Sequence, residues 1–167
     1  MQSASVTATV RIRRAGISDL DDLLALEQQA FDGDRMSRAQ YRRHLDSDSA
    51  RVLVASAAQH RFLGAAVVFF RTGSRVARLY SLASHPEGHG HGIGTALINA
   101  VEVMASRRHC RVLRLEVRCD NRRAIVLYER LGYQRIGQLA AYYEDGADGW
   151  RYEKVLEPAG TEQLPAA

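Results

Sequence analysis

Four glycines alternate with other residues in the segment Pro-Glu-Gly-His-Gly-His-Gly-Ile-Gly-Thr at positions 86–95. Glycines between a strand and a helix let the backbone turn tightly and approach a ligand closely. The N–H groups at a helix N-terminus carry partial positive charge, so this segment could hold a pyrophosphate. It lacks the lysine of a nucleoside-triphosphate loop, and the dinucleotide pattern would need glycine at Ile93 or Thr95. The alternative is a flexible loop that caps a helix.

Three histidines, His85, His89 and His91, lie in or beside this loop and raise the question of a metal site. Metal ligands need a fixed geometry and a complete set of partners. The loop adds no cysteine, and its glycine backbone is expected to be mobile. We therefore expect no metal at these histidines.

A glutamate interrupts an apolar strand pattern at residues 112–117. Leu113, Leu115 and Val117 share one face of this strand, and Glu116 points to the other. A strand covered by helices normally reads as apolar throughout. Glu116 is therefore expected either to pair with a neighbouring arginine or to face a cleft, where it could act as a general base.

Asn121 and Tyr128 follow on the next predicted helix. Asparagine is a preferred helix N-cap, and a cap beside a cleft can also contact a ligand. Tyr128 lies two helical turns later, at the rim of the apolar face. It is either an aromatic residue at the edge of the core or a proton donor.

The run His89-Gly90-His91-Gly92-Ile93-Gly94 resembles the coenzyme A loop, Arg/Gln-x-x-Gly-x-Gly/Ala, of the GCN5-related N-acetyltransferase (GNAT) family. The resemblance covers about residues 9–156, with His89 where the family usually has Arg or Gln. It implies acetyl-CoA as co-substrate, no metal, and a thioester oxygen bound by backbone N–H groups. The cofactor-binding residues that it implies are Leu82, Ala83, Ser84, His89, Gly90, His91, Gly92, Ile93, Gly94, Thr95, Asn121 and Ala124. Because the loop would bind phosphates through its backbone, we expect acetyl-CoA binding to survive the histidine.

The pattern Glu-x-x-x-x-Asn followed by Ala-x-x-x-Tyr resembles the ribosomal-protein N-terminal-alanine acetyltransferase branch of this family. That resemblance implies Glu116 as the base and Tyr128 as the acid, in direct transfer without a covalent enzyme intermediate. The pair Tyr142-Tyr143, soon followed by glycine, also resembles this branch, in which such tyrosines hold the acceptor peptide.

The expected acceptor is a primary amine, and a protein or peptide N-terminal α-amine fits best. An α-amine has a pKa of ~8, against ~10.4 for lysine, so it loses its proton more readily. Glu144, Asp145 and Asp148 in the last turn favour a cationic acceptor such as a basic peptide or a polyamine. The alternatives are a lysine side chain, a small-molecule amine, or a coenzyme A-binding module without catalysis.

The elements that must position these residues alternate between helical and extended patterns. The first helix is expected to begin at a capping box from Ser18 to Asp21 and to stop at Gly33. A second capping box runs from Ser37 to Gln40, with a hydrophobic staple between Met36 and Tyr41. Strands are expected at 9–14, 51–56, 62–71, 76–84, 112–117, 133–142 and 150–156, and further helices from Ile93 and from Asn121 to Gly132. This order predicts an α/β (mixed α+β) fold of the GNAT type, a mixed sheet of about seven strands flanked by about four helices.

The chain of 167 residues is long enough for one domain, expected at 9–156 between a flexible N-terminus, 1–8, and a flexible tail, 157–167. No apolar run is long enough to span a membrane, and Cys110 and Cys119 are expected as reduced thiols of a cytoplasmic protein. The net charge of +4 comes from scattered arginines, which argues against a nucleic-acid binder. Arg122, Arg123 and Arg130 are expected near the cofactor, where they either screen phosphates or remain solvated. We expect a monomer or a homodimer.

Overall fold

A computed structural model of the chain describes residues 9–57 and 61–159. Its strands are β1 (Arg11–Arg14), β2 (Ala50–Ala57), β3 (Arg61–Phe69), β4 (Val76–Ser84), β5 (Val112–Arg118), β6 (Gln134–Leu139) and β7 (Gly149–Val155). Its helices are α1 (Leu20–Ala30), α2 (Arg38–Asp46), α3 (Ile93–Arg107) and α4 (Arg122–Arg130). The order of elements is the predicted one. The expected flexible N-terminus, 1–8, and residues 160–167 of the expected flexible tail, 157–167, lie outside the described residues.

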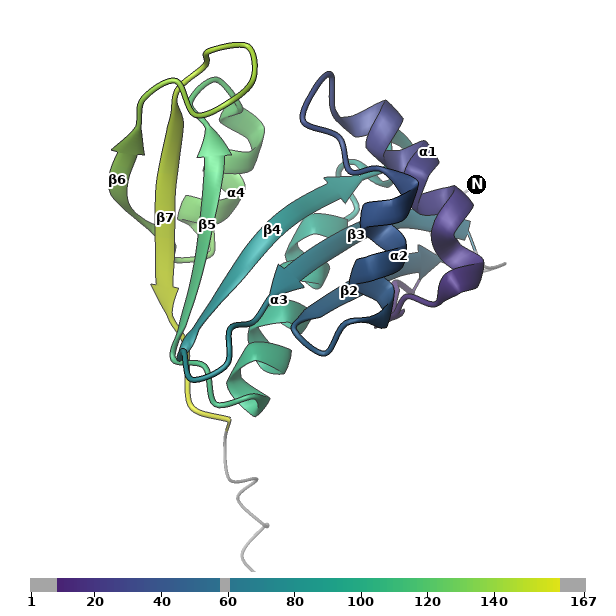
Figure 1. Ribbon diagram of the computed structural model, residues 1–167, viewed down its shortest axis with the longest axis horizontal. Helices are drawn as coiled ribbons and strands as arrows, with labels where there is room; N and C mark the ends of the chain where they lie inside the picture. Colours follow the sequence, from purple (N-terminus) through teal and green to yellow (C-terminus); the bar gives the residue numbers. More distant parts are fainter. Residues whose placement is uncertain (1–8, 58–60, 160–167) are drawn as a thin grey trace, which may run out of the picture.

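One mixed sheet carries all seven strands, in the order β1-β2-β3-β4-β5-β7-β6. Neighbouring strands are antiparallel except for β4 and β5, which run parallel at the centre. Helices α1 and α2 cover one face over β2, β3 and β4, and α3 and α4 lie on the opposite face (Figure 1). The predicted α/β fold is therefore confirmed. None of the helices in the described part of the chain is long and apolar enough to cross a membrane.

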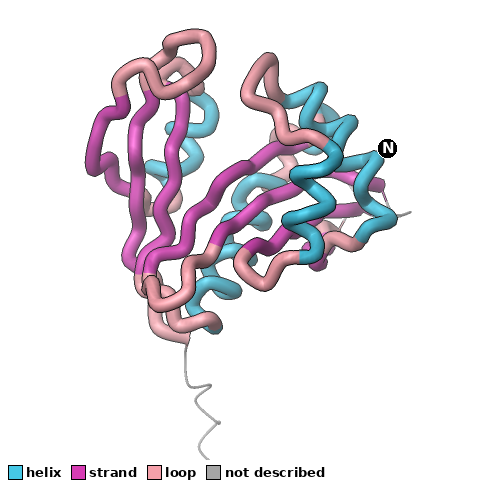
Figure 2. Tube along the Cα trace, viewed as in Figure 1, coloured by secondary structure: helices cyan, strands magenta, loops and turns pink. Residues whose placement is uncertain are grey.

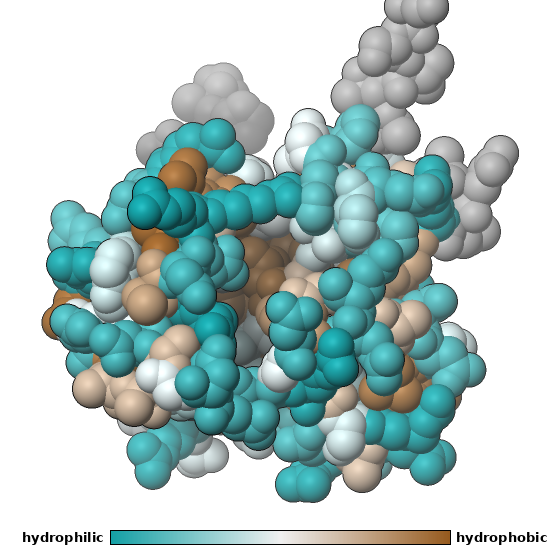
Figure 3. All heavy atoms as spheres, turned by 90° about the horizontal axis from the view of Figure 1, so that it is seen from above, coloured by the Kyte–Doolittle hydropathy of each residue, from teal (hydrophilic) through white to brown (hydrophobic). Residues whose placement is uncertain are grey.

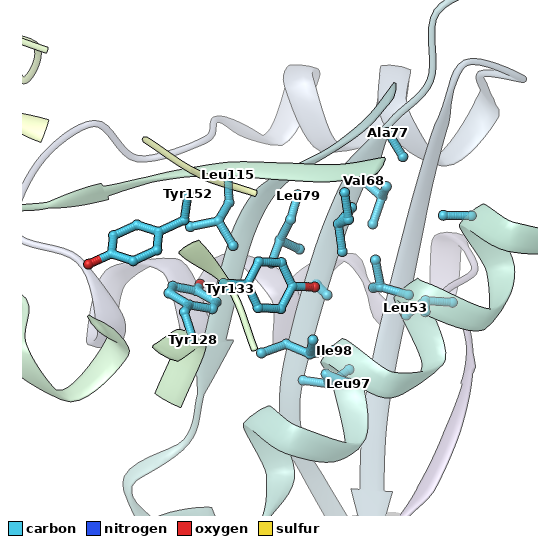
Figure 4. Close-up of a cluster of buried hydrophobic side chains, with 14 of the residues drawn as sticks. Leu53, Val68, Ala77, Leu79, Leu97, Ile98, Leu115, Tyr128, Tyr133 and Tyr152 are labelled. Atoms are coloured by element: carbon cyan, nitrogen blue, oxygen red, sulfur yellow. The ribbon is translucent and has the colours of Figure 1, made fainter. Parts of the chain in front are cut away.

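Two hydrophobic cores lie on the two faces of the sheet. One lies between the sheet and α1 and α2, and it includes Leu23, Tyr41 and Val54. The larger core lies under α3 and α4, where Leu97 and Ile98 of α3 face the sheet (Figure 4). Each strand between them must therefore bury both of its faces.

The two central strands pair over only part of their length, four of nine residues in β4 and four of seven in β5. Parallel pairing runs from Val76 and Val112 to Leu79 and Leu115, and the strands then diverge (Figures 1 and 2). Tyr80 is an extra residue in β4, because Leu79 pairs with Val68 of β3 whereas Ser81 pairs with Val67. Such a bulge bends and twists its strand. It ends the pairing with β5 and leaves a split in the middle of the sheet.

The bulge also exchanges the faces of β4. Before it, Ala77 and Leu79 belong to the core under α3; after it, Ala83 belongs to the core under α1 and α2. The alternation of a regular strand would keep all three odd-numbered residues on one face.

The second capping box has the predicted form. The Ser37 hydroxyl accepts from the backbone N–H of Gln40 at 3.2 Å, and the Gln40 side chain accepts from the backbone N–H of Ser37 at 2.7 Å. Met36 and Tyr41, the predicted staple, are both buried in the same core. The buried carboxylate of Glu27 accepts from the Tyr41 hydroxyl at 2.7 Å and from the backbone N–H of Met36 at 3.0 Å. These contacts fix the start of α2.

Some expected boundaries were wrong. The first helix does not begin at a capping box from Ser18 to Asp21, because Asp19 is its N-cap and makes no side-chain cap bond. The Asp19 carboxylate instead accepts from the Gly16 backbone N–H and pairs with Arg13. A 3-10 turn at Ile17–Asp19 therefore precedes α1. The first helix ends at Ala30, before Gly33, because Phe31 takes an extended backbone.

The expected strand at 133–142 is shorter. Strand β6 ends at Leu139, and Ala141 has a positive φ of 47°, which turns the chain before the tyrosine pair. Tyr142 and Tyr143 therefore lie in the β6–β7 loop, which gives their side chains a freedom of direction that a strand would not allow.

Gly64 of β3 provides a test of the packing between the sheet and α3. A Cβ at this position would lie 2.8 Å from the Ala83 carbonyl oxygen and 2.8 Å from Ile93 Cγ2. Since one of these neighbours is backbone, Gly64→Ala should lower the free energy of unfolding by ~1–3 kcal/mol. Urea unfolding measures this loss.

Gly137→Ala is the matched control, because no atom lies within 4 Å of a Cβ placed there. An alanine at a compatible position restricts the unfolded chain, so its stability should stay equal or rise by up to ~1 kcal/mol. Equal losses in the two variants would contradict the packing described here.

Candidate active site

A cavity of about 930 Å³ lies at the open end of the split. It is bordered by the end of α1, the end of β4, the glycine-rich loop, the first turn of α3 and one side of α4 along its whole length. Seen from above, the molecule is hollowed between its two halves, with apolar atoms at the bottom (Figure 3). Of the predicted cofactor-binding residues, the cavity is lined by Leu82, Ala83, Ser84, His89, Gly90, Gly92, Ile93, Gly94, Thr95, Asn121 and Ala124. His91 of the same loop is not among the lining residues.

The glycine-rich loop has the backbone shape of an anion cradle. Gly90 and Gly92 have positive φ angles of 80° and 73°, and no atom lies within 4 Å of a Cβ built on either. Gly92 is the N-cap of α3 and offers no side-chain oxygen to the first turn. The N–H groups of that turn are therefore available to an external acceptor at the positive end of the helix dipole. A phosphate group fits this cradle.

His89 contacts a residue that its position in the sequence does not suggest. Arg123 of α4 places Nη1 2.6 Å from Nδ1 of His89. Arginine only donates hydrogen bonds, so the imidazole nitrogen is the acceptor. A cation thus stands beside the position where the family usually has Arg or Gln.

Charge around the cavity is of one sign. Arg122, Arg123 and Arg130 line it, and no Asp or Glu does so in the part of the chain that the structure describes. Guanidinium groups match phosphate geometry, and a site without carboxylates attracts anions. The residues present therefore fit the phosphates of a coenzyme A molecule.

Asn121 has the expected capping role. Its side-chain oxygen accepts from the backbone N–H of Ala124 at 3.2 Å, at the start of α4. The same side chain lines the cavity. The cap therefore holds the first turn of α4 at the cavity wall.

Tyr128 lies in the core with its hydroxyl unused. Its ring packs edge-on against Tyr133 with centroids 5.8 Å apart (Figure 4), and only 6% of the residue is exposed. The hydroxyl makes no hydrogen bond to any described residue. Every polar side-chain atom that is fully buried among the described residues has a hydrogen-bond partner. Because the Tyr128 hydroxyl has none, it must keep some solvent-accessible surface. Burial raises the pKa of Tyr128, so the hydroxyl holds its proton at neutral pH.

Glu116 lies where β5 leaves β4, and it is ion-paired. Its side chain is 7% exposed, with Arg78 Nε 3.0 Å from Oε2 and Arg151 Nη2 3.2 Å from Oε1. Arg151 is its direct cross-strand neighbour in β7. The contacts of Glu116 in the structure are thus those of an ion pair with neighbouring arginines.

The tyrosine pair lies beside Glu116. The Tyr142 hydroxyl accepts from Arg78 Nη2 at 2.9 Å, and the two tyrosine rings stand perpendicular with centroids 5.1 Å apart. The Arg118 guanidinium stacks on the Tyr143 ring at 5.0 Å. Burial, more than its neighbours, raises the pKa of Tyr143 to about 12. Both rings are therefore held in place by arginines.

The carboxylates of the acidic turn are less available to a cationic acceptor than the sequence suggests. Asp145 pairs with Arg118 at 2.6 Å, which lowers the pKa of its carboxyl to about 2. Asp148 accepts from the Ala141 backbone N–H at 2.9 Å. Two of the three carboxylates thus serve the loop itself. Glu144 comes within 3.9 Å of a Cβ placed on Gly33, so the α1–α2 loop lies beside this turn.

The described residues near the cavity form no cluster of metal-ligand side chains. Across residues 9–57 and 61–159, no three His, Cys, Asp or Glu side chains gather closely enough to hold a metal ion. The Nδ1 atom of His89 accepts from the Arg123 guanidinium, so this nitrogen has no free lone pair for a metal ion.

Comparisons with known proteins agree with this architecture. Residues 17–133 match the model of the Acetyltransferase (GNAT) family. N-alpha-acetyltransferase 30 of Schizosaccharomyces pombe is 35% identical over 101 residues, which cover 59% of this chain and 66% of that protein. An uncharacterised protein of Mycobacterium leprae is 31% identical over 137 residues, which are 80% of this chain but 37% of that protein. The chain thus spans less than two thirds of the length of either curated relative.

Solved structures have the same fold. The ribosomal-protein-S18-alanine N-acetyltransferase of Escherichia coli superposes with a TM-score of 0.79 and 24% identity, covering 92% of this chain and 98% of that one. A spermidine/spermine N-acetyltransferase of Vibrio cholerae gives a TM-score of 0.74 and 20% identity over 87% and 92% of the two chains. By its match to the family model, the chain belongs to the GNAT acetyltransferase family.

The cap at Asn121 gives a stability prediction. Asn121→Ala should lower the free energy of unfolding by ~0.5–2 kcal/mol, because the Ala124 N–H loses its acceptor. Asn121→Asp keeps the acceptor oxygen and should remain close to the wild type in urea unfolding. If the aspartate variant were as unstable as the alanine variant, the cap would not be the source of the loss.

Proposed function

We propose that this GNAT family member transfers an acetyl group from acetyl-CoA to a primary amine, with a protein or peptide N-terminal α-amine as the best candidate. One observation carries the proposal: the cofactor-fitting cavity lies at the open end of the split, between the end of β4 and α4, and Glu116 lies where β5 leaves β4. A cofactor in the cavity and an acceptor beside Glu116 would meet where the strands diverge. Such positioning is itself a large part of catalysis.

The cofactor side of the proposal rests on the loop and the arginines. Backbone N–H groups at 92–95 would hold the pyrophosphate, with Arg123 beside it and Asn121 at the wall. Acetyl-CoA, when bound, supplies an acetyl group activated as a thioester. The backbone of Leu82, Ala83 and Ser84, on the border of β4 that β5 has left, would offer N–H groups to the carbonyl oxygen.

Glu116 would act as the base. A carboxylate offers ~four acceptor positions, and those of Glu116 receive one bond at Oε2 and two at Oε1. One position at Oε2 is left for a water molecule or for the amine. The attacking amine must lose a proton, and Glu116 would take it directly or through that water.

Tyr128 would act as the acid. Its hydroxyl makes no bond within the described residues and holds its proton because burial raises its pKa. Donation of this proton at the sulfur would assist departure of the thiolate. Both reactants are held at once, so no covalent enzyme intermediate is needed.

An N-terminal α-amine is favoured as acceptor on chemical grounds, since it loses its proton more readily than a lysine side chain. The names of the relatives from Schizosaccharomyces pombe and Escherichia coli point the same way. A polyamine is the second candidate. The Vibrio cholerae neighbour has that specificity by name, and Glu144, with no partner among the described side chains, lies beside the α1–α2 loop that carries Asp34.

Three further expectations belong to this proposal. We infer one acetyltransferase domain at 9–156, a cytoplasmic location consistent with the two free cysteines, and a monomer or homodimer.

The acceptor is tested by incubating the protein with acetyl-CoA and a mixed set of amines. The set holds peptides with a free N-terminus, N-acetylated peptides with one lysine, and spermidine. Mass spectrometry should find a gain of one acetyl group on the free N-termini first, at neutral pH. If lysine or spermidine were acetylated faster, that amine and not the N-terminal α-amine would be the preferred acceptor. Binding of acetyl-CoA without turnover would indicate a non-catalytic module.

Two left-handed glycines test the cradle. Gly92→Val places a side chain in the cavity, whereas Gly73→Val adds a similar strain at φ 78° in the distant β3–β4 turn. Both variants should lose stability, because a branched residue is strained at positive φ. Only Gly92→Val should lose the rise in melting temperature that acetyl-CoA gives the wild type. A full thermal shift in a folded Gly92→Val protein would exclude the loop as the cradle.

Tyr128→Phe separates packing from proton donation. The variant keeps the ring contact with Tyr133 and removes the hydroxyl. If Tyr128 is the acid, kcat should fall by up to ~100-fold with acetyl-CoA affinity little changed, because the help is lost only in the transition state. Steady-state kinetics and calorimetry measure the two quantities. An unchanged kcat would leave Tyr128 as a packing residue.

A further inference from the structure

Arg78 is the one described side chain that hydrogen-bonds to both Glu116 and Tyr142. Its Nε donates to Glu116 Oε2 at 3.0 Å, and its Nη2 donates to the Tyr142 hydroxyl at 2.9 Å. The three residues come from β4, β5 and the β6–β7 loop. A single guanidinium therefore joins the two sides of the split.

The fork of the guanidinium makes this double contact possible. Its N–H donors are fixed in one plane, so the positions of the two acceptors are linked through the group. Arg78 also stacks on Tyr80, the residue of the bulge, with Cζ 5.7 Å from the ring centroid. Its charge is paired with the Glu116 carboxylate, and its side chain is 40% exposed.

Arg151 offers a natural comparison. It pairs with the same carboxylate, at Oε1, with Nε at 3.3 Å and Nη2 at 3.2 Å. Within the described chain it makes no hydrogen bond to either tyrosine. The two arginines thus share the contact with Glu116 and differ in the contact with Tyr142.

We propose that Arg78 is a positioning residue that couples acceptor binding at Tyr142 to the orientation of the Glu116 carboxylate. The inference rests on the proposed function, in which Tyr142 contacts the acceptor and Glu116 is the base. An acceptor that displaces or shares the Tyr142 hydroxyl pulls on the same guanidinium that holds Oε2. Oε2 has the one lone-pair position left for the amine proton. Binding of the acceptor amine and orientation of the Glu116 carboxylate therefore occur together.

The proposal separates the effects of the two arginines on acceptor kinetics. Arg151→Met removes one partner of Glu116 and should lower kcat with the KM for the acceptor within about twofold of wild type. Arg78→Met should lower kcat and also raise the acceptor KM by about tenfold, because Tyr142 loses its partner as well. The affinity for acetyl-CoA, measured by calorimetry, should be unchanged in both variants. Urea unfolding of each variant confirms that it is folded.

A double-mutant cycle tests the coupling itself. Tyr142→Phe alone should raise the acceptor KM by about tenfold, and Arg78→Met in that background should raise it little further. Arg78→Lys keeps a cation beside Glu116 without the fork, so kcat should recover in part while the acceptor KM stays high. If Arg78→Met folds poorly, Arg78→Lys still tests whether the fork of the guanidinium is needed.

The outcomes distinguish this inference from the function on which it rests. Additive effects of Arg78→Met and Tyr142→Phe on KM, or an Arg78→Met variant that behaves as Arg151→Met does, would overturn the positioning role and leave the proposed function intact. A Glu116→Gln variant with wild-type kcat, or a wild-type protein that acetylates no amine, would overturn both.

Discussion

The site depends on the point at which two parallel strands stop pairing. Strands β4 and β5 are held together up to Leu79 and Leu115, and the bulge at Tyr80 ends their contact. The core under α3 and α4 continues across both halves of the sheet, so the halves stay joined through it where the strands separate. The two helices pack closely, because a Cβ on Gly94 of α3 would lie 2.9 Å from Leu127 of α4.

The balance of charge differs between the cofactor cavity and the surroundings of Glu116. The cofactor cavity is lined by three arginines and by no described carboxylate, which suits a ligand with several phosphates. Across the split, Glu116 is matched by two arginines, and the tyrosine rings are held by Arg78 and Arg118. The reacting groups are thus oriented by ion pairs in addition to packing. A charged residue in a buried strand is stable there only with such partners.

Local patterns predicted most of the fold and part of the site. The helix and strand order, the second capping box and the glycine loop follow from short-range spacing, and each is in the structure. The sequence predicts that Glu116, as a charge in a buried strand, needs a basic partner, but it does not identify the partner. Arg78 is 38 positions away and reaches Glu116 only because β4 and β5 pair in parallel. The bulge at Tyr80 and the early end of β6 have no local signal, because a register shift depends on both strands.

The central claim, that both reactants meet in the split, is tested most directly by amide hydrogen exchange with a bisubstrate analogue, coenzyme A joined to the N-terminal amine of a peptide. The account predicts slower exchange at 82–84, 89–95 and 121–124 on the cofactor side and, in the same experiment, at Tyr142 and Tyr143 on the acceptor side. The β3–β4 turn around Gly73, at the closed end of the sheet, should not change. Protection confined to the cofactor side, or centred on that distant turn, would contradict it.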